Sequence, residues 1–386
     1  MNTLQLSKLG EIAKIFLKLG VIGFGGPVAH IAMIEDEVVT RRQWLTKDHF
    51  LDLLGATNLI PGPNSTEMAI HIGYIYAGWL GLIVAGVCFI FPAVFITGFL
   101  AWLYINYGTL PQFSPLLYGI KPAVLGIIIN ALWKLSKKAV KTKQLLIIGI
   151  LVSLVTWFGD INEVIALLLG GIFGMIWLRK NNQITLIIPA FTIAVTGQEI
   201  AVNSLSVPLW KLGLFFLKIG SVLFGGGYLL IAFLQGELVE KYGWLTQQQL
   251  LDAIAIGQFT PGPVLSTATF IGYVISGFPG AIVATLGIFI PSFVFVAILN
   301  PIIPWLRNSS WTRAFLDAVN VSAVALMVVT TLQIGMTTLG LENISNIDFF
   351  SIAIFVISTF LIIRYSVNSA WVVLGSALLG WGFTLL

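Results

Sequence analysis

Long apolar runs separated by short polar segments dominate the chain. Most of these runs are uninterrupted and, at about 1.5 Å of rise per residue, are predicted to be helices that cross a membrane. Glycine and proline interrupt two further runs, 12–34 and 50–77, and their counterparts in the second half. The uninterrupted runs are 79–106, 114–134, 145–158, 162–178, 279–300, 315–339, 349–363 and 368–386. We therefore predict an all-α polytopic membrane protein with about 12 to 13 membrane segments.

The two halves of the chain repeat each other. FLKLGVIGFGG at 16–26 recurs as FLKIGSVLFGG at 216–226, and IPGPNSTEMAIHIGY at 60–74 recurs as TPGPVLSTATFIGY at 260–273. So many glycines and prolines in one shared order exclude a chance match. Further aligned pairs are Glu37 with Glu237, WLT at 44–46 with WLT at 244–246, Asp52 with Asp252, and Pro92 with Pro291. We predict an N-terminal repeat at 1–180, a linker with a short apolar segment at 181–207, and a C-terminal repeat at 208–386.

Composition supports a membrane protein and excludes a soluble one. Hydrophobic residues make up 58% of the chain and charged residues 9%, with a mean hydropathy of +0.97, whereas an ordinary globular chain is about 25% charged. The net charge of +4 is modest, and the basic residues lie in loops and segment ends, so no nucleic-acid partner is expected. Cys88 is the single cysteine and is interpreted as a small buried hydrophobe. The first 20 residues lack a small-residue cleavage site and are expected to remain in the mature fold.

The positive-inside rule suggests how the interrupted runs are placed. If each run enters and leaves by one face, the basic residues of the first half gather on one side, which would be the cytoplasm. The alternative, in which both runs cross fully, leaves Arg41, Arg42 and Lys47 outside. If the apolar linker segment 184–197 also crosses, the second half is inverted. Inversion would place some basic residues of the second half inside the cell and leave others outside, so the positive-inside rule does not decide the question. Because inverted repeats are a usual architecture of alternating-access transporters, we favour inversion, with the N-terminus in the cytoplasm.

The paired breaks predict a site for an anion. Non-helical backbone at membrane depth survives only inside protein or beside a water-filled cavity, and a proline can begin a half-helix whose free N–H groups attract an anion. The alternative is a plain kink that eases helix packing. Candidate substrate-binding residues are Phe24, Gly25, Gly26, Pro27, Pro61, Gly62, Pro63, Asn64, Ser65, Phe224, Gly225, Gly226, Gly227, Pro261, Gly262 and Pro263.

An anion in apolar surroundings also requires a fixed cation, because a helix terminus offers only about 0.3 to 2 kcal/mol. Lys121 is the best candidate, since a lysine in the middle of a span costs about 2.5 to 3.5 kcal/mol and is rarely without a function. Its counterpart in the second half is Asn320, so a lysine site there is asymmetric. Lys18 and Lys218 are a second candidate cation pair, or they extend to the membrane interface.

Acidic residues and histidines supply candidates for coupling. Glu67 and His71 lie one helical turn apart and form either a proton-linked pair or a hydrogen-bonded pair that faces water. We expect Thr46 and Thr246 to cap helices, and Glu37 and Glu237 to pair with bases. These two glutamates, with Asp52 and Asp252, have structural or coupling roles. We find no metal-ligand spacing and no catalytic motif, so neither an enzyme nor a cofactor is expected.

Together these motifs resemble the chromate ion transporter family in its long, two-half form. The resemblance rests on the duplicated FGG motif, the glutamate and WLT block, and PGP followed by IGY, and it covers nearly the whole chain. It implies an inner-membrane secondary transporter that exports chromate and confers resistance, with sulfate as a competing oxyanion. Two departures are Gly227 in place of Pro27 and Asn320 in place of Lys121. Expected partners are the oxyanion, the lipid bilayer and a second copy in a homodimer.

Three functions remain open. The first is chromate export by alternating access. The second is uptake or exchange of sulfate or another anion, and the third is an anion channel, although no charged ring or filter repeat is present. Export needs no coupling ion, because a dianion that moves outward across an inside-negative potential of 100 mV gains about 4.6 kcal/mol.

Overall fold

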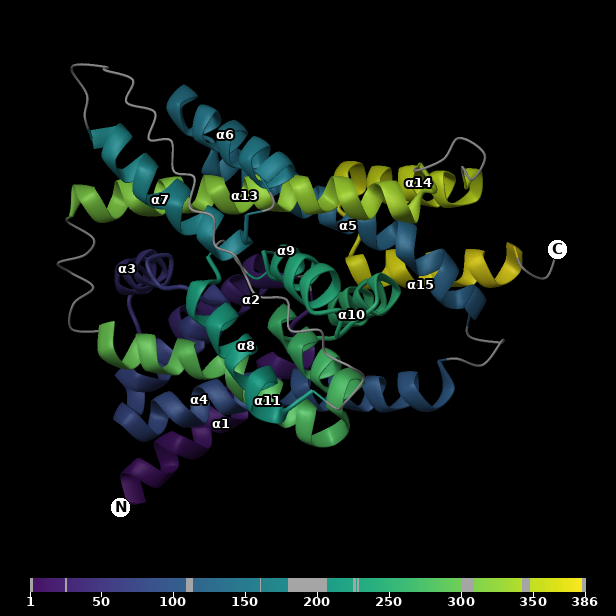
Figure 1. Cartoon of the computed structure of the whole chain (residues 1–386). Coiled ribbons are helices and arrows are strands. Elements are labelled where there is room, and N and C mark those ends of the chain that lie inside the picture. The colour runs from purple at the N-terminus through teal and green to yellow at the C-terminus, as the bar shows by residue number, and fades with distance from the viewer. Residues whose placement is uncertain are drawn as a thin grey trace.

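The computed structural model describes residues 3–24, 26–108, 114–159, 161–179, 207–224, 227, 229–299, 309–341 and 348–383. Within these residues the structure is helical and contains no strand, as the hydropathy pattern predicts (Figure 1). The first half contains α1 (Thr3–Ile22), α2 (Gly26–Glu35), π-helical η1 (Asp36–Arg41), α3 (Lys47–Thr57), α4 (Asn64–Tyr107), α5 (Ser114–Ala139), α6 (Lys143–Gly159) and α7 (Glu163–Arg179). The linker predicted at 181–207 lies outside the described residues except for Val207.

The second half repeats this order of elements. It contains α8 (Leu209–Val222), α9 (Leu230–Phe233), π-helical η2 (Leu234–Lys241), α10 (Gln247–Phe259), the short 3-10 turn η3 (Val264–Ser266), α11 (Thr267–Leu299), α13 (Ser310–Thr338), α14 (Phe349–Tyr365) and α15 (Ser369–Phe383). The threonines expected to cap helices do so. Thr46 accepts a hydrogen bond from the N–H of His49 at the start of α3, and Thr246 forms a reciprocal capping box with Gln249 at the start of α10.

Four helices of the described chain are long and apolar enough to cross a membrane. They are Asn64–Tyr107, Pro115–Ala139, Val264–Ile298 and Ser310–Thr338. Four shorter apolar helices, Lys143–Gly159, Glu163–Leu178, Phe349–Tyr365 and Ser369–Phe383, accompany them. Large apolar side chains lie exposed on these helices, for example Phe95, which is 65% exposed, and Phe360, which is 56% exposed. Such surfaces suit lipid, so the chain is a multi-pass membrane protein.

The first interrupted run forms a helical hairpin. Helix α1 ends just before Gly23, and α2 with η1 returns antiparallel beside it. Two ion pairs join the two arms: Lys18 on α1 with Glu37 on η1 at 2.5 Å, and Glu11 on α1 with Arg42. The turn between the two helices, residues 23–26, is called the glycine tip; its second-half counterpart is 223–227.

The second interrupted run forms another hairpin. Helix α3 leads to the loop Pro61–Pro63, which is called the proline tip (second half: Pro261–Pro263), and the first part of α4 returns from it. The rings of Trp44, just before α3, and Tyr76, at the end of the first part of α4, stack with centroids 3.8 Å apart. The chain therefore enters and leaves this hairpin at the same end. Helix α4 then bends at Gly78, which has a φ of +66°, and continues as the long span.

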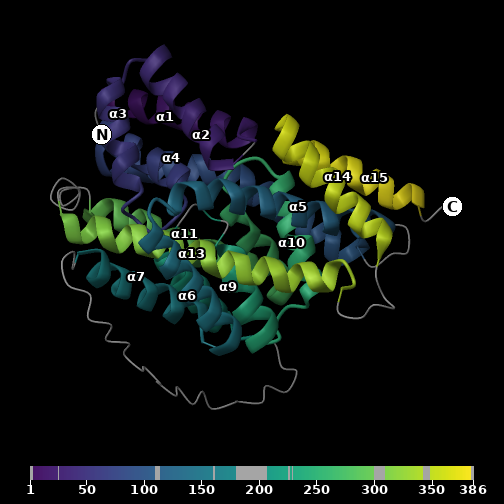
Figure 2. The same cartoon turned by 90° about the horizontal axis from the view of Figure 1, so that it is seen from above.

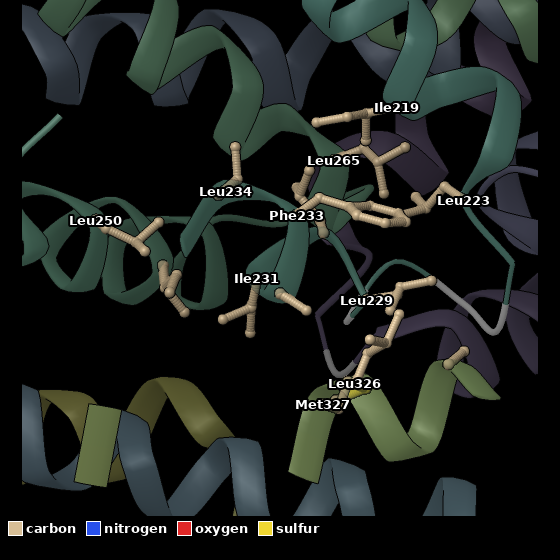
Figure 3. Packing of buried hydrophobic residues seen from close by; sticks show 14 of the residues in the cluster. Ile219, Leu223, Leu229, Ile231, Phe233, Leu234, Leu250, Leu265, Leu326 and Met327 are labelled. Carbon is tan, nitrogen blue, oxygen red and sulfur yellow. The ribbon is translucent and has the colours of Figure 1, made fainter. Parts of the chain in front are cut away.

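The second half builds the same two hairpins. Lys218 on α8 pairs with Glu237 on η2, as Lys18 pairs with Glu37. Helix α11 bends at Gly277 with φ +61° and ψ −153°, close to the +66° and −151° of Gly78. The buried side chains around this second pair of hairpins form one core: Figure 3 shows Phe233 between Ile219, Leu223 and Leu265, with Leu326 and Met327 of α13 below.

The two halves are interleaved, because α4 of the first half packs against α11 of the second. Helix α4 passes the second proline tip, where Ala93 lies against Gly262, and then reaches α10, where Tyr104 bonds to Asp252. Helix α11 runs antiparallel to α4: Thr97 of α4 bonds to Ser266, just before α11, whereas Phe293 near the end of α11 lies against Gly86, which comes earlier in α4. The predicted inversion agrees with this antiparallel pair.

Helices are also exchanged between the halves. Helix α5 packs against α14 and α15, whereas α13 packs against α6 and α7. Small residues allow the close approach: Gly119 of α5 touches Gly380 of α15, and Ala318 of α13 touches Gly174 of α7. These six helices lie together in the upper part of Figure 1, and α13 runs across the molecule in both views (Figures 1 and 2).

Candidate functional site

The tips of the four hairpins meet between the two halves. The backbone N–H of Gly62 donates to the carbonyl oxygen of Leu223 at 2.7 Å, and the N–H of Gly262 donates to the carbonyl of Gly23, also at 2.7 Å. Each proline tip is therefore bonded to the glycine tip of the other half. The backbone groups freed by breaking the helices find partners across the centre of the molecule, as they must at membrane depth.

Glycine is required at the tips by their backbone conformation. The φ angles are +80° at Gly26, +144° at Gly62, +86° at Gly227 and +90° at Gly262, a region that other residues rarely adopt. Space is short as well. A Cβ added at Gly62 would overlap the Glu67 carboxyl and lie 2.6 Å from the Ser292 hydroxyl.

Half-helices begin beside the tips. Pro63 and Pro263 occupy the N-cap positions, one residue before the first helical turn, and α4 and η3 start at Asn64 and Val264. The first N–H groups of these helices therefore lie at the junction, where a helix N-terminus favours negative charge. Asn64 bonds to the side chain of Asn58 at 2.6 Å, and Ser65 is buried.

His30 connects the glycine tip to this helix start, a role that its isolated position in the sequence does not indicate. One ring nitrogen, Nε2, lies 2.8 Å from the carbonyl oxygen of Gly23, and Nδ1 lies 3.3 Å from the hydroxyl of Ser65. Of the candidate residues at the glycine tips, Phe24 is 41% exposed, Phe224 is half-buried and Gly227 is buried. Gly25, Gly225 and Gly226 lie outside the described residues.

Lys121 lies away from the proline tips, near the other end of α10. It is half-buried on α5, which packs against α10, and its positive charge acts on the carboxyl group of Asp252. Asp252 is fully buried and accepts a hydrogen bond of 2.9 Å from Tyr104. Asn320, the counterpart of Lys121, is half-buried on α13. The structure thus gives Lys121 an acidic neighbour that the sequence did not associate with it.

Lys18 and Lys218 form ion pairs at the bases of the hairpins. Glu37 is 6% exposed. Its carboxylate forms ion pairs with the Nζ of Lys18 at 2.5 Å and the Nε of Arg42 at 3.5 Å. The hydrogen bond from Lys18 and the nearby cations lower the pKa of Glu37 below its ordinary value of 4.5, against the opposing effect of burial. Glu237 is 1% exposed and also accepts a hydrogen bond of 2.9 Å from Asn162. Both pairings with bases were expected.

The two candidate coupling residues are enclosed. Glu67 and His71 are both 0% exposed, and neither bonds to the other or to another group among the described residues. The alternative of a hydrogen-bonded pair that faces water is therefore wrong. Asp52, on α3, is exposed.

Comparison with known proteins agrees with this architecture. The model of the family "Chromate transporter" matches residues 10–175 and 210–381. A "Probable chromate transport protein" from Synechococcus elongatus is 34% identical over 86% of each chain. The "Chromate transport protein" of Cupriavidus metallidurans is 31% identical over 98% of this chain and 94% of its own, and that of Pseudomonas aeruginosa is 31% identical over 84% and 80%. No solved structure matches. The chain belongs to the chromate transporter family.

Proposed function

We propose that this chain exports chromate from the cytoplasm, and thereby gives chromate resistance, by alternating access at the junction of the tips. The reciprocal bonds Gly62 to Leu223 and Gly262 to Gly23 carry this proposal. Two helix starts and four glycines with positive φ lie at or beside these bonds between the two repeats, which supports a site there. Relatives named as chromate transport proteins support the choice of anion. The role is therefore that of a transporter and not of an enzyme.

The electrical potential supplies the driving force in this proposal. A dianion leaving an inside-negative cell gains about 2.3 kcal/mol per charge for each 100 mV, or about 4.6 kcal/mol in total. At about 1.4 kcal/mol for each factor of ten, this sustains a concentration ratio of about a thousand.

Lys121 is the proposed cation for the anion path, with Asp252 as its counter-charge in the conformation described. Because the carboxyl group of Asp252 offsets the lysine when no anion is present, the lysine need not be buried as an unpaired charge. An arriving oxyanion would compete with Asp252 for Lys121. Lys18 and Lys218 hold glutamates and are assigned a structural role.

The remaining assignments belong to the same proposal. The bases Lys14, Lys18, Arg41, Arg42 and Lys47 belong to the first-half hairpins, so we place that end of the molecule and the N-terminus in the cytoplasm, and the chain in the inner (plasma) membrane. The proposed division into repeats at 1–180 and 208–386 follows the sequence. A homodimer in lipid is the proposed assembly.

Chromate flux into inside-out vesicles tests the direction of transport. These vesicles expose the cytoplasmic face, so an exporter moves chromate into the lumen, faster when the lumen is positive. Uptake driven by a lumen-negative potential would contradict export. Flux of sulfate without chromate would move the substrate to another oxyanion, and flux that does not saturate would indicate a channel.

A further inference from the structure

Unpartnered polar atoms gather beside the first proline tip. Thr66, Glu67 and His71 on α4 and Ser292 on α11 together contribute six of the ten buried side-chain oxygen and nitrogen atoms that have no hydrogen-bond partner in the described part of the chain. All four side chains are 0% exposed. Buried polar groups normally have partners, so this cluster is unusual enough to indicate a function.

Glu67 lies where the two halves meet. Its carboxyl group and the Ser292 hydroxyl both lie against Gly62, the residue that donates to Leu223. The carboxyl group therefore comes from one repeat and a neighbouring hydroxyl from the other, and both lie against the residue whose N–H closes the tip. Any movement that separates the tips changes the surroundings of Glu67.

Neither carboxyl oxygen of Glu67 has an ion-pair or hydrogen-bond partner among the described residues. Helix α11 carries no acid or base other than Tyr273, and His30 on α2 is bonded to Gly23 and Ser65. The other titratable groups on elements packed against α4 are Lys8, Glu11, Lys14 and Lys18 on α1, Glu35 on α2, Lys47, Asp48, His49 and Asp52 on α3, and Asp252 on α10, and no bond from any of them to Glu67 is described.

These surroundings favour the protonated form of Glu67. An ionised carboxylate that is buried without a cation or a donor is strongly unfavourable. A protonated carboxyl group has one O–H donor and a carbonyl acceptor, which suits a neighbouring hydroxyl such as that of Ser292.

We propose that Glu67 is the proton-binding residue of this transporter. It carries a proton while the tips are closed and releases it when they separate. The carboxyl O–H bond then breaks and the proton passes to water on one side of the membrane, and the carboxylate takes up a proton from water on the other side before the tips close again. The aligned second half has STATF at 266–270 in place of TEMAIH at 66–71, so each chain has one such site. This inference rests on the proposed function, because it couples proton movement to anion transport at the same tips.

Infrared spectroscopy of the purified full-length protein tests the protonation directly. A protonated carboxyl group has a C=O stretch separate from that of a carboxylate. We expect a C=O band at pH 7.5 that is lost in Glu67→Gln and kept in Glu35→Gln, whose glutamate pairs with Lys47 at the surface. A spectrum unchanged by Glu67→Gln would overturn the proposal. If that variant does not fold, Ser292→Ala is expected to shift the band, and an unshifted band would overturn the proposal.

Proton movement during chromate flux tests the coupling. In weakly buffered vesicles containing a pH dye, wild type and Glu35→Gln should move protons when a chromate gradient is imposed. Glu67→Gln has an amide that cannot release a proton, so the number of protons moved per chromate ion should fall by at least about nine-tenths. Proton movement retained in Glu67→Gln would overturn the inference. Absence of chromate flux in wild type would instead overturn the proposed function, and the infrared result would still stand.

Discussion

The N–H of Gly62 donates a 2.7 Å hydrogen bond to the carbonyl oxygen of Leu223, at the end of a helix in the other half of the chain. The equivalent bond joins Gly262 to Gly23, so each half supplies the partner for the broken helix of the other. The junction is therefore a shared structure, and a change in one half is expected to reach both.

Replacing Gly62 with alanine should destabilise the protein. The φ of +144° disfavours any side chain, and the new methyl group would overlap the Glu67 carboxyl. We expect a loss of about 1 to 3 kcal/mol in the free energy of unfolding, seen as a lower Tm in detergent. Gly98→Ala on α4 is the control, because the nearest neighbour of its new methyl group would be 3.7 Å away. Equal Tm values for the two variants would contradict the described tip.

The exchange of helices between halves predicts a sensitive contact at Gly119. An added Cβ there would overlap the backbone carbonyl of Ser376 on α15. Gly119→Ala should therefore lower the Tm by several degrees, since backbone cannot yield easily. Gly375→Ala on α15, where nothing lies within 4 Å, should leave the Tm near wild type. A harmless Gly119→Ala would show that α5 and α15 are not partners.

The ion pair of Glu37 with Lys18 predicts a pH dependence of stability. The pKa of Glu37 is lowered in the folded state, so its contribution is fully present above its unfolded pKa of about 4.5 and is lost as pH falls through the folded value. Glu37→Gln should cost about 1 to 3 kcal/mol near pH 7. Thermal unfolding from pH 7 to pH 3 measures the difference, which should shrink below pH 4.5; a constant difference would exclude the ion pair as its source.

Cysteine labelling tests whether the interrupted runs return to one face. With Cys88 replaced, Val39→Cys and Ala77→Cys should react with a membrane-impermeant reagent from the same side. Trp44, which follows Val39, stacks on Tyr76, which precedes Ala77, so the ends of the two interrupted runs lie close together. Reaction from opposite sides would mean that the second hairpin crosses the membrane.

Local signals in the sequence predicted the breaks well. The gap between the runs 50–77 and 79–106 falls at Gly78, where α4 bends, and the repeated motifs identified both pairs of tips. Glycine and proline act on their own stretch of backbone, so their effect is visible in the sequence.

Long-range partners were harder to predict. The approach of Lys121 to Asp252 and the contact of Gly119 with Gly380 depend on helices exchanged between halves. Ser292 and His30 carry no motif, and their roles arise from residues that lie across the junction. The π-helical turns at Asp36–Arg41 and Leu234–Lys241 had no signal in the residue pattern.

Chromate uptake into inside-out vesicles with a lumen-positive potential, measured for wild type, Lys121→Gln and Lys134→Gln, tests the central claim most directly. Lys134 lies exposed on the same helix and is the matched control. We predict rapid uptake in wild type and Lys134→Gln and a decrease of about tenfold or more in Lys121→Gln, equivalent to at least about 1.4 kcal/mol. Wild-type uptake in Lys121→Gln would contradict the assigned cation, and no chromate uptake by wild type would contradict chromate export itself.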